Sequence, residues 1–192
     1  DTILENLPGT SFSNATLTLK IYGERSFYEK GPLLITHWGL SGPALLKLSA
    51  WAAREMMHTN YKAKIIVNWL GLERQDDVEK LLATIKNSNT KTNIGKAYPK
   101  ELTKRFWHQL LIKCEIQKEI NWSEVSKNQL NRILNNLFKC ELEVIGKSRF
   151  KEEFVECGGV DLKEINFKTM ESKVCPGLYF SGEVIDIDGI TG

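Results

Sequence analysis

The segment at residues 36–44, THWGLSGPA, places a histidine beside closely spaced glycines and a proline. Because an imidazole titrates near neutral pH, His37 can donate or accept a proton beside a bound substrate, and it is a candidate catalytic residue. An apolar run precedes the segment, and Pro43 suits the first turn of a helix. The segment therefore predicts a strand, a Gly-containing loop and a helix N-terminus, whose backbone N–H groups can bind an anion or a cofactor.

Plainer interpretations of the same segment stay open. The glycines of a strand–helix turn often serve only to relieve backbone strain, and a loop histidine often makes only structural hydrogen bonds. A serine-hydrolase elbow is excluded, because that turn needs Gly-x-Ser-x-Gly and Pro43 stands here at the last position.

A second candidate site is the acidic block at residues 182–192, GEVIDIDGITG. Its spacing does not match an EF-hand loop, so the three acidic residues do not predict a calcium site. We expect residues 177–182 to form a buried strand that ends in a tight turn. A carboxylate directly after such a strand can accept hydrogen bonds from ribose- or ribityl-type hydroxyls.

A third feature is a basic run at residues 86–105, where six lysines and arginines stand against Glu101 alone. Tyr98 and Trp107 are nearby, a combination found in proteins that bind single-stranded nucleic acid. The alternative is a solvated loop and helix face, which the whole-chain charge of +2 favours.

Metal binding is not expected from the cysteines. The four of them lie far apart, with no Cys-x-x-Cys pair and no Cys/His cluster, so the expectation is a reduced cytoplasmic protein with free thiols and no metal.

The elements that must position these residues divide the chain into parts. Residues 15–22, 33–36 and 62–70 have the alternating or β-branched pattern of strands. Residues 42–57 predict one helix, and the stretch 73–139 predicts three amphipathic helices, of which the second opens at Pro99 and the third at Ser126 with Gln129 in a capping box. Residues 142–144 and 150–157 are further strand candidates.

This pattern predicts an α+β fold, an antiparallel β-barrel-like domain with an inserted small helical bundle. The expected division is a first β-rich part at 1–72, a helical subdomain at 73–139, a second β-rich part at 140–175 and a final segment at 176–192. With 192 residues, 42% of them hydrophobic, the chain is long enough for a core. No apolar run approaches the roughly 20 residues that span a bilayer, so no membrane partner is expected.

Four blocks together resemble one family in the same order: THWGLSGPA at 36–44, GGV at 158–160, TMESK at 169–173 and PGLYFSGEVIDIDG at 176–189. This is the BaiN/RdsA-like family of bacterial FAD-dependent, NAD(P)H-linked oxidoreductases. The resemblance implies a much longer protein with a Rossmann-type FAD domain, into which a barrel-like and a helical domain are inserted. The chain has no Gly-x-Gly-x-x-Gly and no initiator Met, so we expect it to be the insert region of such a protein, inactive alone and without tightly bound FAD.

The resemblance also implies residue roles. The loop at 36–44 would face substrate or flavin through Gly39, Ser41 and Gly42. The residues implied to bind FAD are Gly182, Glu183, Asp186, Asp188, Gly189 and Gly192. The expected partners are the missing FAD-binding domain of the same chain and a small-molecule substrate. The alternative function is a binding module whose Lys-rich helical segment docks a partner or a nucleic acid.

Overall fold

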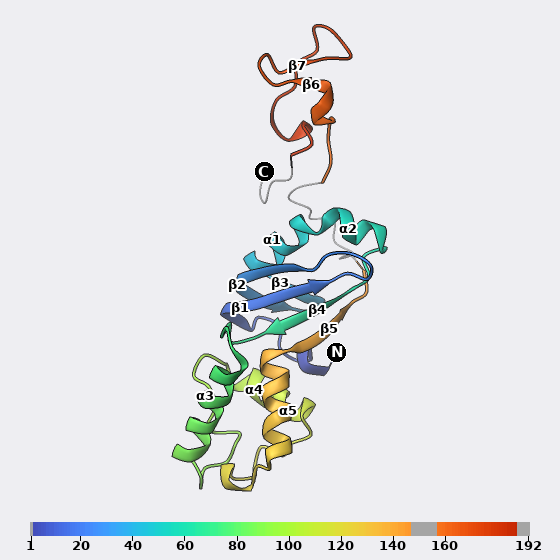
Figure 1. The fold of residues 1–192 in the computed structure, drawn as a ribbon. Coiled ribbons are helices and arrows are strands. Elements are labelled where there is room, and N and C mark those ends of the chain that lie inside the picture. The colour runs from blue at the N-terminus through green and yellow to red at the C-terminus, as the bar shows by residue number, and fades with distance from the viewer. Residues whose placement is uncertain (1, 147–156, 188–192) are drawn as a thin grey trace.

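In the computed structural model, which describes residues 2–146 and 157–187, a five-stranded antiparallel sheet has the strand order β3-β2-β1-β4-β5. Its strands are β1 (Ser11–Lys20), β2 (Phe27–Thr36), β3 (Gly39–Ser41), β4 (Ala63–Asn68) and β5 (Cys140–Val144). The sheet forms a half-barrel, and Figure 1 shows helices on both sides of it. This confirms the α+β prediction.

The central strand β1 shows why the alternating sequence folds in this way. Leu17 and Leu19 point to the buried face, and Ala15 continues the same row. Phe12 is also buried although it is three residues before Ala15, because the pairing of β1 with β2 shifts register between these two residues. Strict alternation would leave the Phe12 side chain exposed, and the bulge turns it toward the core.

The helices α1 (Pro43–Trp51) and α2 (Ala53–His58) pack on one side of the sheet, above it in Figure 1. The sequence predicted one helix over this stretch, and the structure interrupts it at Ala52. The interruption is local, because the Ala52 N–H still donates to Leu48 and the Ala52 carbonyl still accepts from Met56.

Between β4 and β5 the chain forms the helical lobe, which contains α3 (Gln75–Ser88), α4 (Lys104–Lys113), the short η2 (Trp122–Glu124) and α5 (Lys127–Phe138). The capping box at Ser126 and Gln129 is confirmed. The second helix does not begin at Pro99 as predicted. It begins after Thr103, whose hydroxyl accepts a hydrogen bond from the Phe106 N–H and so caps the free end of the helix.

One hydrophobic core joins the helical lobe to the sheet. Phe12 of β1, Trp69 after β4 and Phe106 of α4 meet with ring centroids 4.7–4.8 Å apart. This three-ring contact fixes α4 against the half-barrel, because large aromatic rings in contact contribute both buried area and a preferred geometry.

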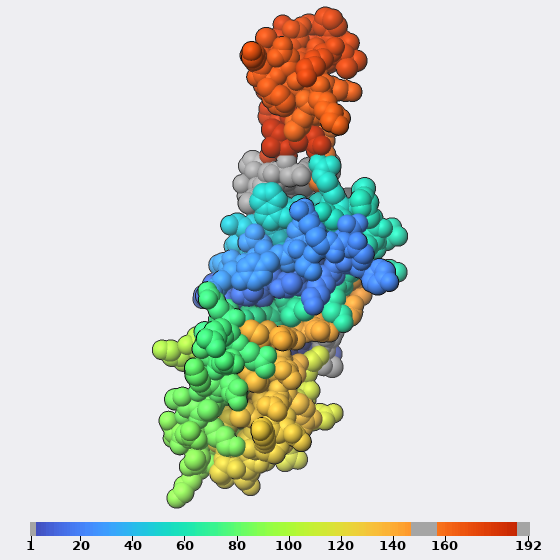
Figure 2. Space-filling view, viewed as in Figure 1, coloured from blue at the N-terminus to red at the C-terminus, as the bar shows by residue number. Residues whose placement is uncertain are grey.

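Residues 157–187 form a small C-terminal lobe, orange to red in Figures 1 and 2, which appears as a separate mass on the visible face. It contains the two-residue strands β6 (Ile165–Asn166) and β7 (Glu171–Ser172) and the short helices η3 (Leu162–Glu164) and η4 (Gly182–Val184). The predicted buried strand at 177–182 is absent from this lobe: Tyr179 makes one isolated bridge to Glu171 and is exposed. The predicted strand at 150–157 falls almost wholly outside the described residues.

No helix in the described ranges has the length and the apolar content to cross a membrane.

Candidate functional site

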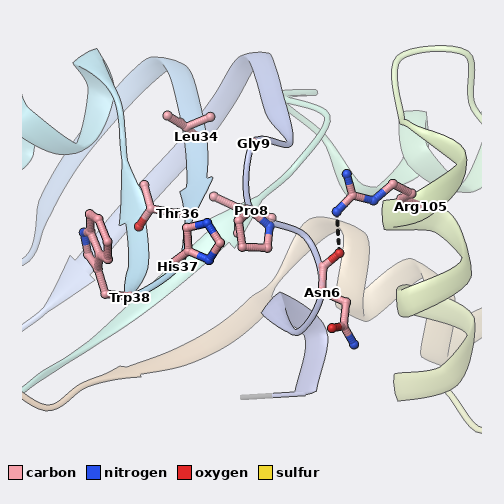
Figure 3. A pocket seen from close by; sticks show the side chains of 9 residues that line it. Asn6, Pro8, Gly9, Leu34, Thr36, His37, Trp38 and Arg105 are labelled. Carbon is pink, nitrogen blue, oxygen red and sulfur yellow. Dashed lines mark hydrogen bonds between the residues drawn. The ribbon is translucent and has the colours of Figure 1, made fainter.

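An open depression lies where the β2–β3 hairpin, the N-terminal segment and α4 meet, and Figure 3 shows its side chains. We call it the hairpin pocket, and its lining residues are Asn6, Pro8, Gly9, Leu34, Ile35, Thr36, His37, Trp38 and Arg105. His37 therefore lies in a pocket, as a catalytic role requires, and shares it with a cationic side chain from a different part of the chain.

The hairpin turn itself consists of His37 and Trp38. Thr36 and Gly39 flank the turn as the last paired residues of β2 and β3, and the Thr36 hydroxyl donates to the Gly39 carbonyl at 3.1 Å. Both turn side chains are exposed, Trp38 by 66%, and their ring centroids lie 6.2 Å apart. A tight, paired turn thus holds an imidazole and an indole at the rim of the pocket.

The loop predicted between strand and helix is shorter than its sequence suggests, because Gly39 and Ser41 belong to β3. Gly42 then forms the N-cap of α1 with φ 107° and ψ 166°. A Cβ at this position would lie 2.9 Å from the Pro32 carbonyl oxygen, so only glycine lets the chain pass from β3 into the helix against β2.

Arg105 enters the pocket from the first turn of α4, and sequence reasoning did not assign it to a site. Its guanidinium donates to the Asn6 carbonyl at 2.5 Å, which ties the helical lobe to the N-terminal segment (Figure 3). Asn6 has φ 58°, a left-handed conformation that turns this segment beside the pocket. In the sequence, Arg105 stands out only as a member of the basic run. That run indicates a positive charge, but it does not indicate a contact with Asn6, which lies 99 residues earlier in the chain.

The described part of the acidic block, residues 182–187, lies in the C-terminal lobe, and none of these residues lines the hairpin pocket. Gly182 has φ 73° and opens η4, while Glu183 is exposed. Asp186 accepts a hydrogen bond from Arg54 of α2 at 2.5 Å, and this ion pair joins the lobe to the half-barrel. Asp188, Gly189 and Gly192 lie outside the described residues.

Three of the four blocks that carry the family resemblance meet, in their described residues, inside the C-terminal lobe. Val160 forms a parallel bridge with Ile185, and a Cβ on Gly159 would lie 2.6 Å from the backbone of Ile185. The Phe180 N–H donates to the Met170 carbonyl at 3.0 Å. Blocks up to 26 residues apart in the sequence are therefore in backbone contact, and the close approach requires glycine at position 159.

The described C-terminal lobe has few buried positions that could surround a flavin. Gly182 and Glu183 are exposed on the surface of a lobe in which, among the large apolar side chains, only Ile165 and Ile185 are buried. The described part of this lobe therefore does not by itself enclose an isoalloxazine ring or a pyrophosphate. The described part of the chain also contains no group of three His, Cys, Asp or Glu side chains that could hold a metal ion.

The fold is a mixed α+β domain. It consists of a five-stranded antiparallel half-barrel with a helical lobe inserted between β4 and β5. The chain belongs to the HI0933-like family, since the family model described as "HI0933-like protein barrel and H2TH domain" matches residues 1–155. The resemblance to the BaiN/RdsA-like family is thereby confirmed.

Three curated relatives are similar to the chain. It is 30% identical over its whole length to a ribosomal RNA dihydrouridine synthase of Haemophilus influenzae, of which it covers 44%. It is 29% identical over 83% of its length to a ribosomal RNA dihydrouridine synthase of Escherichia coli, of which it covers 37%. It is 26% identical over 85% of its length to a 3-dehydro-bile acid delta(4,6)-reductase of Clostridium scindens, of which it covers 40%. The chain thus spans less than half the length of these relatives.

Proposed function

We propose that the chain is the substrate-side region of a longer flavin-dependent oxidoreductase, which uses FAD and NAD(P)H to reduce an activated carbon–carbon double bond. Family membership supports this, and so do the names of the relatives, because a dihydrouridine synthase and a delta(4,6)-reductase both reduce such a bond. The observation that carries the proposal is the hairpin pocket, where the THWGLSGPA segment places a histidine and a tryptophan opposite an arginine.

The pocket offers groups suited to that reaction. Reduction of a carbon–carbon double bond adds a hydride and a proton, and the flavin supplies the hydride when it is bound. His37 is the proton donor in this proposal, since its imidazole carries an N–H group and lies at the pocket rim. The exposed ring of Trp38 can stack on a planar unsaturated substrate, and the Arg105 guanidinium can bind its carbonyl oxygen or a phosphate.

The C-terminal lobe and the outer face of α1 and α2 are proposed to dock on an FAD-binding domain of the same protein. The lobe exposes Phe167, Val174 and Tyr179 while burying little, so it lacks a core that would stabilise it alone. Leu46, Trp51 and Met57 are exposed on the two helices, and apolar exposure of this kind marks an interaction surface. In the docked protein the acidic block would approach the ribityl or phosphate part of FAD.

The catalytic part of the proposal is tested on the longer protein by stopped-flow absorbance under anaerobic conditions. Flavin reduction by NADPH or NADH is measured first. Reoxidation is then followed with a uridine-containing RNA and, separately, with an unsaturated 3-oxo steroid. His37→Gln should leave flavin reduction unchanged and slow reoxidation by about 10²–10⁴-fold, the usual contribution of a general acid.

The matched control is His58→Gln, because His58 lies at the end of α2, near Glu24 and outside the pocket. It should reoxidise at the wild-type rate. Wild-type reoxidation by His37→Gln with both acceptors would show that His37 is not the proton donor.

A further inference from the structure

Two chain segments of the helical lobe run side by side and carry exposed lysines. Four backbone hydrogen bonds of 2.9–3.0 Å join residues 90–95 to residues 118–123. Lys91, Lys96 and Lys118 are exposed on or directly beside this paired stretch. We call residues 90–96 and 118–123 the basic ledge.

Three side-chain ring nitrogens hold the backbone carbonyls of residues 94, 95 and 97 in place. Two of the rings belong to α4, and the third belongs to the ledge itself. Trp107 donates to the carbonyl of residue 94 at 2.8 Å, and Trp122 donates to the carbonyl of residue 97 at 3.0 Å. The His108 Nε2 lies 3.0 Å from the carbonyl of residue 95. The two indoles also stack, with ring centroids 6.2 Å apart. These bonds restrict the backbone of a loop that connects two helices, which reduces the entropy lost when it binds a ligand.

Gly95 makes the close approach of the two segments possible. A Cβ at this position would lie 2.8 Å from the Lys118 Cβ and 2.9 Å from the Lys118 carbonyl oxygen. The small residue therefore brings the backbones of Lys96 and Lys118 together, so that two cationic side chains start from adjacent points.

The charge of the ledge is only partly compensated. Lys118 has Glu119 at 3.9 Å, at the limit of an ion pair, and Glu124 instead accepts a hydrogen bond from the Asn121 N–H at 2.7 Å. No ion pair of Lys91 or Lys96 is found among the described residues.

Helix α4 links the ledge to the hairpin pocket. Within one turn of this helix, Arg105 faces the pocket while Trp107 and His108 hold the ledge. An α-helix with its side chains is about 10–12 Å across, and this diameter sets the scale of the separation between the two regions that α4 contacts.

We propose that the basic ledge binds the phosphate backbone of an RNA whose base enters the hairpin pocket. This inference rests on the proposed function, because it makes RNA the substrate class of the same site, as in the two relatives named for ribosomal RNA. Phosphate contacts position a nucleic acid without reading its sequence, and exposed lysines on a hydrogen-bonded backbone suit that task.

The test is fluorescence anisotropy with the 192-residue chain and a labelled, uridine-containing single-stranded RNA, in about 50–200 mM KCl. The triple variant Lys91→Gln, Lys96→Gln, Lys118→Gln removes the ledge charges. Its affinity should fall at least about tenfold, and the slope of log K against log salt should become shallower by about 2, the value for three lost contacts to a single strand.

The matched control carries the same charge change on the half-barrel, as Lys30→Gln, Lys47→Gln, Lys62→Gln, since these lysines are also exposed. It should retain wild-type affinity and slope. Equal losses in both triple variants, or absence of wild-type binding at the lowest salt, would overturn the ledge proposal. This assay needs no flavin, so its failure is distinct from failure of the redox proposal, which the flavin assays report.

Discussion

The conformation of Gly42 provides a quantitative test of how the hairpin pocket is built. Gly42→Ala places a methyl group in a backbone region essentially restricted to glycine, at φ 107° and ψ 166°, which costs about 1–3 kcal/mol. The new Cβ also lies 2.9 Å from the Pro32 carbonyl oxygen and 3.1 Å from the Leu33 Cα. Both are backbone atoms of β2, so relief of the clash must move the strand, and overpacking of this kind costs about 1–3 kcal/mol more.

The variant should therefore lose about 2–6 kcal/mol of unfolding free energy. For a chain of this size, each kcal/mol lowers Tm by roughly 2–4 °C. Thermal unfolding followed by far-UV circular dichroism measures it. Gly39→Ala is the matched control, because Gly39 has φ 145° but no heavy atom within 4 Å of the new methyl group. It should lose clearly less stability. A Gly42→Ala variant as stable as wild type, or no more destabilised than Gly39→Ala, would refute the close packing of β3 and α1 on β2.

Three further predictions concern other parts of the molecule. Burial raises the pKa of Cys114 to about 12 and of Cys140 to about 11, so in a native thiol titration with Ellman's reagent only the two exposed cysteines should react. Both thiols have a higher pKa in the folded protein than in the unfolded chain, so the unfolded chain loses these protons first as the pH rises. The free energy of unfolding, measured by urea titration, should therefore fall between about pH 9 and 12. The hydrogen bond from Lys64 lowers the pKa of Glu141, so this pair stabilises the fold above the ordinary carboxyl pKa, and the effect should vanish at lower pH and in Glu141→Gln. Gly159→Ala, whose methyl group would lie 2.6 Å from the backbone of the acidic block, should increase proteolysis of the C-terminal lobe but leave the half-barrel intact in limited trypsin digestion.

Much of the fold follows from local sequence. The alternating residues of β1, the β-branched run of β4 and the capping box at Ser126 are decided within a few residues, and all three are confirmed. The start of α4 was misplaced because Pro99 is compatible with a first helical turn, whereas the Thr103 cap, four residues later, decides where the helix begins.

The site was predictable only in part. The THWGLSGPA segment indicated a catalytic role for His37, which stays a prediction, but it did not indicate that a two-residue turn would expose His37 and Trp38 together. Arg105 reaches the pocket through tertiary packing of α4, which no local pattern reports. The strand predicted at 177–182 is missing for a related reason: an apolar run forms a buried strand only beside neighbouring strands, and in the described lobe Leu178 and Tyr179 remain exposed.

The most direct test of the central claim is the visible absorbance spectrum of the longer protein that carries this segment, purified beside the 192-residue chain and then mixed anaerobically with NADPH or NADH. We expect a flavin band in the longer protein that bleaches on reduction, and none in the chain alone. A colourless longer protein, or a flavin band that neither nucleotide bleaches, would contradict the proposal that this chain is part of an FAD- and NAD(P)H-dependent oxidoreductase.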